Sequence, residues 1–149
     1  MFQIKEHPHF IYKGLVNLSY QTKLLIMQLP DIQNKNVASF LQSEQLVQET
    51  ADQIMKDFGL FSIIITFSGK LENAYNELHE QLIKQVSDLL VNDYQRLLSV
   101  LYQVDISDKE IEKAKLELPN YNDFEIIAHQ IIVRDLKKVL TRHYFRLNP

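Results

Sequence analysis

The residues best suited to chemistry gather around a histidine in the last third of the chain. His129 lies among apolar residues, with Glu125 one helical turn before it. A histidine beside a carboxylate can act as a general acid or base, and Tyr102 and Asp105 would complete a polar pocket if the fold brought them to His129. A hydrogen-bonded histidine in a core fits the same pattern. We favour that second interpretation and assign no catalytic residue.

Four cationic side chains, at Arg134, Lys138, Arg142 and Arg146, recur at every fourth position near the C-terminal end. On a helix this spacing forms a basic stripe, which predicts binding to an anion, such as a nucleic-acid phosphate, or to an acidic partner. Cations near a helix C-terminus also stabilise the helix dipole. Residues 105–125 carry seven acids and three lysines, so the stripe can be neutralised within the protein. We favour this intramolecular pairing over nucleic-acid binding.

No residue pattern indicates a metal site or a cofactor. Carboxylate-bridged di-iron bundles place Glu three residues before His, but Asn or an aliphatic residue stands there before His79, His129 and His143. Glu77 and Glu80 flank His79 but give too few ligands for a metal site. The three glycines are too far apart for a dinucleotide-binding or phosphate-binding loop, and cysteine is absent. We therefore predict no metal and no cofactor.

The composition is typical of a globular domain in a reducing compartment. The chain has 149 residues and a formal net charge of −3, which gives no overall attraction to nucleic acid or anionic lipid. Without cysteine there is no disulfide framework and no thiolate nucleophile. Neither a leader pattern at the start nor an apolar run of membrane-spanning length occurs. These features predict a cytoplasmic protein that is not inserted in a membrane.

Residues 71–104 show the strongest periodicity in the chain. Their apolar residues recur at three-or-four spacing, which predicts one long amphipathic helix whose stripe must be covered by a partner surface. Such a helix would extend about 51 Å, farther than the shorter helices can cover, so this length favours a homodimer. The stripe comprises Leu71, Ala74, Tyr75, Leu78, Leu82, Val86, Leu89, Tyr94, Leu97, Leu101 and Val104.

Helix-start signals define the rest of the C-terminal half. The segments 107–110 and 122–125 read as capping boxes, which predict two successive helices that pack as an antiparallel pair. The second should run to about Tyr144 and occupy the centre of the bundle, because its apolar residues cover more than one face. Upstream, Asn36 or Ser39 is expected to cap a helix that ends at Gly59.

The segment 60–67 is rich in β-branched and aromatic residues and is predicted as a short buried strand. Its pairing partners would lie at 10–12, 15–18 or 24–27, which could equally be helical; otherwise the segment pairs with its copy in a dimer or is not a strand. The expected fold is mainly α, a bundle of four or five helices with this possible β element. We expect one domain over 1–149, with a weak sub-boundary near 68–70.

Residues 94–98, 101–107 and 128–142 carry a pattern from which Gln103 and Val133 depart. In these segments the C-terminal half resembles small uncharacterised helical proteins of Bacteroidota. The resemblance implies a helical fold and a bacterial cytoplasmic origin. It brings no activity to transfer.

Function is therefore predicted by class only. The leading hypothesis is a non-enzymatic assembly or protein-interaction module that forms a homodimer or binds a protein partner. The alternatives are a small nucleic-acid-binding regulator that uses the basic stripe, and an enzyme with a pocket around His129.

Overall fold

The computed structural model describes residues 32–147, which form an all-helical bundle. No strand occurs within this range. The apolar segments before residue 30, which were candidate strand partners, lie outside the described residues. The helices are α3 (Val37–Phe40), α4 (Glu44–Gly59), α5 (Ala74–Asn92), α6 (Tyr94–Val104), α7 (Asp108–Glu117) and α8 (Asp123–Leu147).

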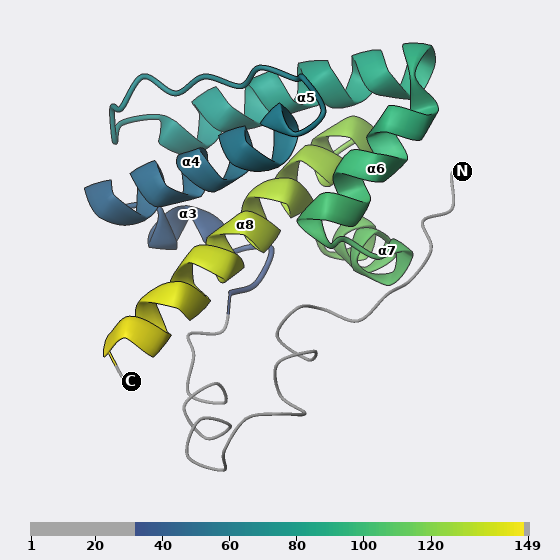
Figure 1. Ribbon diagram of the computed structural model, residues 1–149. Coiled ribbons are helices and arrows are strands. Elements are labelled where there is room, and N and C mark those ends of the chain that lie inside the picture. Colours follow the sequence, from purple (N-terminus) through teal and green to yellow (C-terminus); the bar gives the residue numbers. More distant parts are fainter. Residues whose placement is uncertain (1–31, 148–149) are drawn as a thin grey trace, which may run out of the picture.

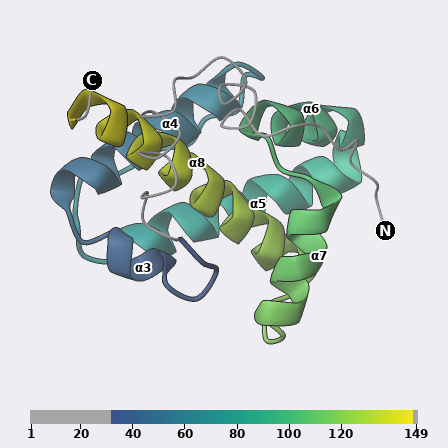
Figure 2. The same ribbon diagram turned by 90° about the horizontal axis from the view of Figure 1, so that it is seen from below.

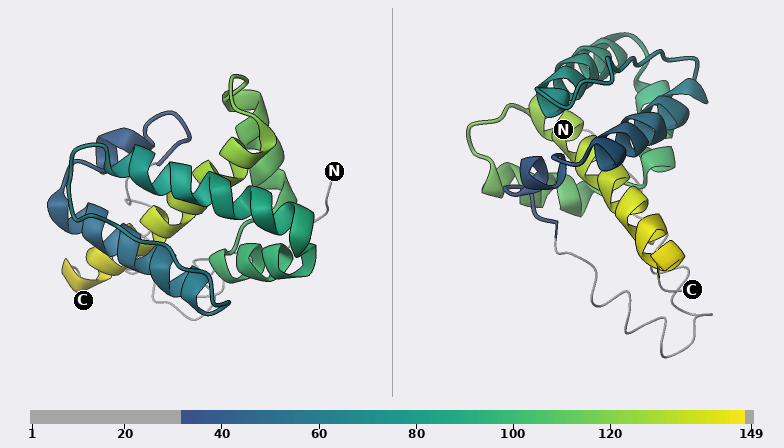
Figure 3. Two further views of the ribbon diagram at one scale, coloured as in Figure 1. Left: turned by 90° about the horizontal axis from the view of Figure 1, so that it is seen from above. Right: turned by 90° about the vertical axis from the view of Figure 1, so that its left-hand side faces the viewer.

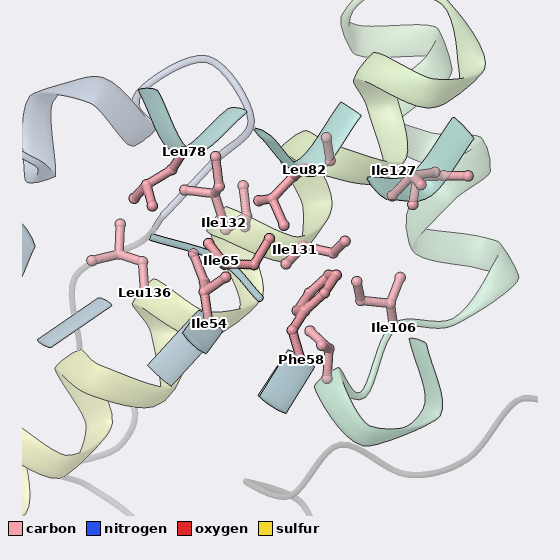
Figure 4. Packing of buried hydrophobic residues seen from close by; sticks show 14 of the residues in the cluster. Ile54, Phe58, Ile65, Leu78, Leu82, Ile106, Ile127, Ile131, Ile132 and Leu136 are labelled. Carbon is pink, nitrogen blue, oxygen red and sulfur yellow. The ribbon is translucent and has the colours of Figure 1, made fainter. Parts of the chain in front are cut away.

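Helix α8 is the centre of the bundle, as its apolar pattern predicted. It crosses the molecule diagonally and contacts α4, α5, α6 and α7 (Figure 1). Ile131, Ile132 and Leu136 are fully buried and meet Ile54 and Phe58 of α4 and side chains of α5 (Figure 4). Residues before and after 68–70 contribute to this same core.

The predicted helix starts at Ser107 and Asn122 are confirmed. The Ser107 hydroxyl accepts a hydrogen bond from the Glu110 amide at 3.3 Å, and the Asn122 side-chain oxygen accepts one from the Glu125 amide at 2.9 Å. The two helices, α7 and α8, lie side by side and are joined by a short turn (Figure 2). The N-terminal helix differs from the prediction, because residues 41–43 separate α3 from α4 and Ser43 caps α4.

The single long helix predicted over 71–104 is wrong. The chain turns at Asp93, where φ is −153° and ψ is 71°, so α5 and α6 meet at a corner (Figure 3). The Asp93 carboxylate accepts a hydrogen bond from the Arg96 amide at 3.1 Å and thereby caps α6. Because the corner folds the stripe back on the bundle, Leu82, Val86, Leu97 and Leu101 are buried within one chain.

The strand predicted at 60–67 is also wrong, although the segment is extended from Ile63 onward. It runs back along α4 toward the start of α5, with Ile63 and Ile65 in the core and Ile64 80% exposed (Figure 3). Side chains of α5 form hydrogen bonds with this segment that a neighbouring strand would form in a sheet. The Gln81 amide bonds the N–H of Thr66 at 3.0 Å and its C=O at 2.7 Å, and the Glu77 carboxylate accepts from the Ser68 N–H at 2.7 Å.

Candidate functional site

The polar pocket predicted from Tyr102, Asp105 and His129 does not assemble. Asp105 lies after α6 and binds Arg134 of α8 in a buried ion pair of 2.9 Å. Tyr102 is 58% exposed on α6. His129 is buried and bonds Tyr75 of α5 instead. The three side chains therefore belong to three different environments.

His129 is part of an aromatic cluster between the first two turns of α5 and the first two turns of α8. The Tyr75 hydroxyl is 2.5 Å from His129 Nδ1, and the Tyr75 ring stacks on His79 with ring centroids 5.0 Å apart. The ring of Tyr121, in the turn before α8, lies 5.6 Å from His79 and 5.8 Å from His129. His79 Nε2 donates to the backbone carbonyl of Glu125 at 2.9 Å. The cluster packs the turn between α7 and α8 against α5.

Burial keeps both members of the Tyr75–His129 pair uncharged. It lowers the pKa of His129 to about 4, an effect that His79 reinforces and the Asn34 backbone opposes. Burial also raises the pKa of Tyr75 well above its usual value, with the hydroxyl of Tyr121 as a further cause. With a pKa of about 4, the His129 imidazole accepts a proton only in acid solution, so the pair is poorly suited to acid–base chemistry near neutral pH. We interpret it as a structural hydrogen bond.

Three members of the basic stripe lie beside α4, with Lys138 largely buried and Arg142 and Arg146 exposed. Lys138 Nζ is 3.1 Å from Asp57 and 3.1 Å from Asp135, and Arg142 donates to the Gln53 side-chain oxygen at 2.7 Å. At the outer end, Glu49 accepts from His143 at 2.7 Å and pairs with Arg146 at 3.5 Å. We call this set the polar seam: Glu49, Gln53 and Asp57 of α4 with Asp135, Lys138, Arg142, His143 and Arg146 of α8.

The stripe is thus paired within the chain, the interpretation that we favoured from the sequence. Most of its partners come from α4, however, and not from residues 105–125. Among the acids of residues 105–125, Asp105 pairs with Arg134. The other three cations lie beside Glu49, Gln53 and Asp57 of α4. These three α4 residues are four positions apart, as the cations are.

The two ends of the polar seam differ in burial. Asp57 and Asp135 are almost fully buried, whereas the Arg146 side chain is 59% exposed. Burial and the neighbouring Asp57 raise the pKa of Asp135 well above its usual value, against the opposing charge of Lys138. Burial also acts to raise the pKa of Glu49, but hydrogen bonds and charges from His143, Gln45 and Arg146 outweigh it and lower that pKa.

An open cleft of about 510 Å³ lies where the α5–α6 corner approaches α7 and α8. We call it the corner cleft. Its apolar lining comes from Leu90, Tyr94, Ile111 and Ile127, and its polar lining from Asp108, Glu112, Lys115 and Asp123. Lys115 lies 3.5 Å from Glu112 and 3.4 Å from Asp123. Apolar walls with a few polar groups are typical of recognition sites.

The corner cleft was not predicted, because it depends on the turn at Asp93. The signal was present in the sequence: aspartate is a strong helix cap, and Asn92 and Asp93 interrupt an otherwise helix-favouring run. A second, smaller cleft of about 320 Å³ is mostly polar. Its amides are bonded to each other or to α7, with Asn34 2.7 Å from Glu117 and 2.5 Å from Gln130.

Metal chemistry finds no support in the part of the chain that the structure describes. No three His, Cys, Asp or Glu side chains between residues 32 and 147 are grouped so that they could hold an ion. Beside His79, Glu77 is engaged with Ser68 of the extended segment. None of the described helices is both long enough and apolar enough to cross a membrane.

Comparison with known proteins gives no match: no family model, no curated protein and no solved structure is significantly similar to this chain. The resemblance of the C-terminal half to helical proteins of Bacteroidota stays a prediction. Function must therefore be argued from the described geometry alone.

Proposed function

We propose that this protein is a non-enzymatic interaction module that binds a protein segment in the corner cleft. The observation that carries the proposal is the cleft itself, an open hollow in which Leu90 and Tyr94 are half-buried over the buried side chains of Ile111 and Ile127. The predicted stripe of residues 71–104 is otherwise largely covered by its own chain. An open apolar concavity on a helical bundle favours insertion of apolar side chains from a partner.

The two alternative functions have less support in the described geometry. The proposed acid or base, His129, is 3% exposed and neutral near pH 7. Two of the proposed nucleic-acid ligands, Arg134 and Lys138, are buried in ion pairs, so phosphate binding would require breaking internal contacts. The corner cleft requires no such rearrangement.

A peptide-display experiment tests the proposal while the natural partner is still unidentified. A library of random-sequence peptides is selected on the full chain, and the selected peptides are then measured by isothermal titration calorimetry. The variant Glu112→Trp places a bulky ring at an exposed position of the cleft lining. Lys109→Trp is the matched control, since Lys109 is also exposed on α7 but does not line the cleft.

The expected result is peptide binding that Glu112→Trp weakens at least tenfold and Lys109→Trp leaves unchanged. Selected sequences should share a bulky apolar residue that fits among Leu90, Ile111 and Ile127. Peptides that bind both tryptophan variants equally well, or no selected peptide at all, would count against the corner cleft as a recognition site.

A further inference from the structure

We propose that the occupant of the corner cleft is a second copy of this chain, which inserts Leu116 of α7. This inference rests on the proposed function, because it assigns a partner to the same cleft. Leu116 is 84% exposed, the highest value among the large apolar side chains described within 32–146. A leucine this exposed, beside an open cleft, favours a contact with another molecule that covers both.

The position of Leu116 on α7 connects it with the cleft. Asp108 and Glu112 line the cleft, and Leu116 follows them at the next four-residue step. Residues four apart lie along one side of a helix, so Leu116 continues the cleft wall outward. It cannot fill the cleft of its own chain, because it projects from the wall into solvent.

A two-fold axis beside α7 would bring the Leu116 side chain of each chain to the cleft of the other. In such a pair each protomer offers the same surface, so a face must carry both a projection and a recess that accepts it. The α7 face carries Leu116 as the projection and the corner cleft as the recess. Each Leu116 would then enter the cleft of the partner copy.

The charges along α7 are compatible with this antiparallel arrangement. The cleft wall is acidic in its first half, at Asp108 and Glu112, and basic toward its end, at Lys115. Lys115 pairs with Glu112 and Asp123 of its own chain, and antiparallel packing of two copies of α7 would add the acids of the partner copy to this network. Asp108 and Asp123 also lie in the first turns of their helices, where they stabilise the helix dipoles, so their share in recognition is partial.

The area requirement extends the contact beyond α7. A stable interface covers about 800 Å² on each partner, and α7 with ten residues is only about 15 Å long. The neighbouring α5–α6 corner supplies more apolar surface, since Val91 is 79% exposed next to the cleft residue Leu90. The proposed interface is therefore α7 together with this corner.

Sedimentation equilibrium of the full chain over a wide concentration range tests the inference. The wild type should be a monomer–dimer mixture, and Leu116→Asp should raise the dissociation constant at least tenfold by placing a charge in the apolar recess. Ile64→Asp is the matched control, because Ile64 is 80% exposed but lies on the segment between α4 and α5. It should leave the dissociation constant unchanged.

Two further variants keep the result decisive if Leu116→Asp folds poorly. Leu116→Ser should weaken the dimer less strongly, and Lys115→Glu should weaken it through repulsion from the partner's acids. Adding Glu112→Lys to Lys115→Glu should restore part of the lost affinity. Circular dichroism of each variant verifies that the helices remain formed.

The outcomes separate this inference from the proposed function. A strictly monomeric wild type, or a dimer that tolerates every change at Leu116, overturns the second-copy occupant. Peptide binding sensitive to Glu112→Trp would then still support a cleft for another protein. A dimer that Leu116→Asp and Glu112→Trp both disrupt supports the two proposals together, and failure of both experiments removes both.

Discussion

The polar seam and the corner cleft both involve helix α8, but they differ in the kind of side chain that is buried. In the seam, charged residues of α4 and α8 enter the bundle and find partners within the chain. In the cleft, the apolar residues Leu90 and Tyr94 are half-buried and Ile111 and Ile127 are buried, and four charged side chains line the same hollow. The seam thus joins α8 to α4 through charged and polar side chains, whereas the cleft lies over apolar residues that belong to the core or pack against it.

The largest effect should come from breaking the buried end of the seam. Lys138→Met removes the cation that lies beside two buried carboxyl groups, those of Asp57 and Asp135. Such uncompensated charge typically costs about 3–5 kcal/mol of unfolding free energy. Urea denaturation measures the loss. Adding Asp57→Asn should recover most of it, and a loss below about 1 kcal/mol would mean that the seam does not hold α4 on α8.

The next largest effect should be a dependence of the unfolding free energy on pH that is caused by Asp135. Its pKa is raised in the folded protein, so between its usual value near 4 and the raised value the folded state binds more protons than the unfolded state. The contribution of Asp135 to stability is therefore full in acid and falls as pH rises through this window. Asp135→Asn should remove that fall and stabilise the protein at alkaline pH.

Urea denaturation across the pH range measures this difference. Asp52→Asn serves as the control, since Asp52 is exposed on α4 and accepts a hydrogen bond from Gln48. An unchanged pH profile in Asp135→Asn would show that Asp135 is ionised in the folded protein at neutral pH.

A smaller effect is expected at the exposed end of the seam. Arg146→Ala removes an ion pair to Glu49 whose arginine side chain is 59% exposed, and such pairs contribute about 0.2–1 kcal/mol. Thermal unfolding at low and high salt should show that this contribution disappears on screening. A loss as large as that of Lys138→Met would contradict the gradient in burial along the seam.

The smallest effect on stability should be found beside the cleft. Leu116→Asp changes a side chain that is 84% exposed, so its unfolding free energy should stay within about 0.5 kcal/mol of the wild type. Chemical denaturation at a concentration below dimer formation measures this. A large loss would place Leu116 in the fold of one chain and would oppose its assignment to an interface.

The sequence predicted the helices whose signals are local. The capping residues Ser107 and Asn122 and the many-sided apolar pattern of residues 126–136 define α7 and α8 without reference to other elements. The turn at Asp93 was missed because the apolar periodicity continues through it: Leu89 and Leu97, on either side, are eight residues apart and both buried. Eight residues are close to two helical turns, so the stripe carries no sign of the bend.

The candidate sites were harder to predict because they depend on which helices meet. The four-residue spacing of the cations was visible in the sequence. The matching spacing of Glu49, Gln53 and Asp57 predicts their pairing with these cations only if α4 is known to lie along α8. The strand prediction failed for a related reason. Residues 60–67 have the composition of a strand, yet the hydrogen-bonding partners of Thr66 and Ser68 are side chains of α5.

The bonds from Gln81 and Glu77 have a consequence for aggregation. Residues 63–67 read Ile-Ile-Ile-Thr-Phe, an uncharged β-prone run without proline or glycine, which is the composition that stacks into cross-β fibrils when it is released. Two side chains of α5 occupy hydrogen-bonding groups of Thr66 and Ser68 that a neighbouring fibril strand would otherwise use. While the bundle is folded, Gln81 and Glu77 therefore hinder the addition of another strand at Thr66 and Ser68.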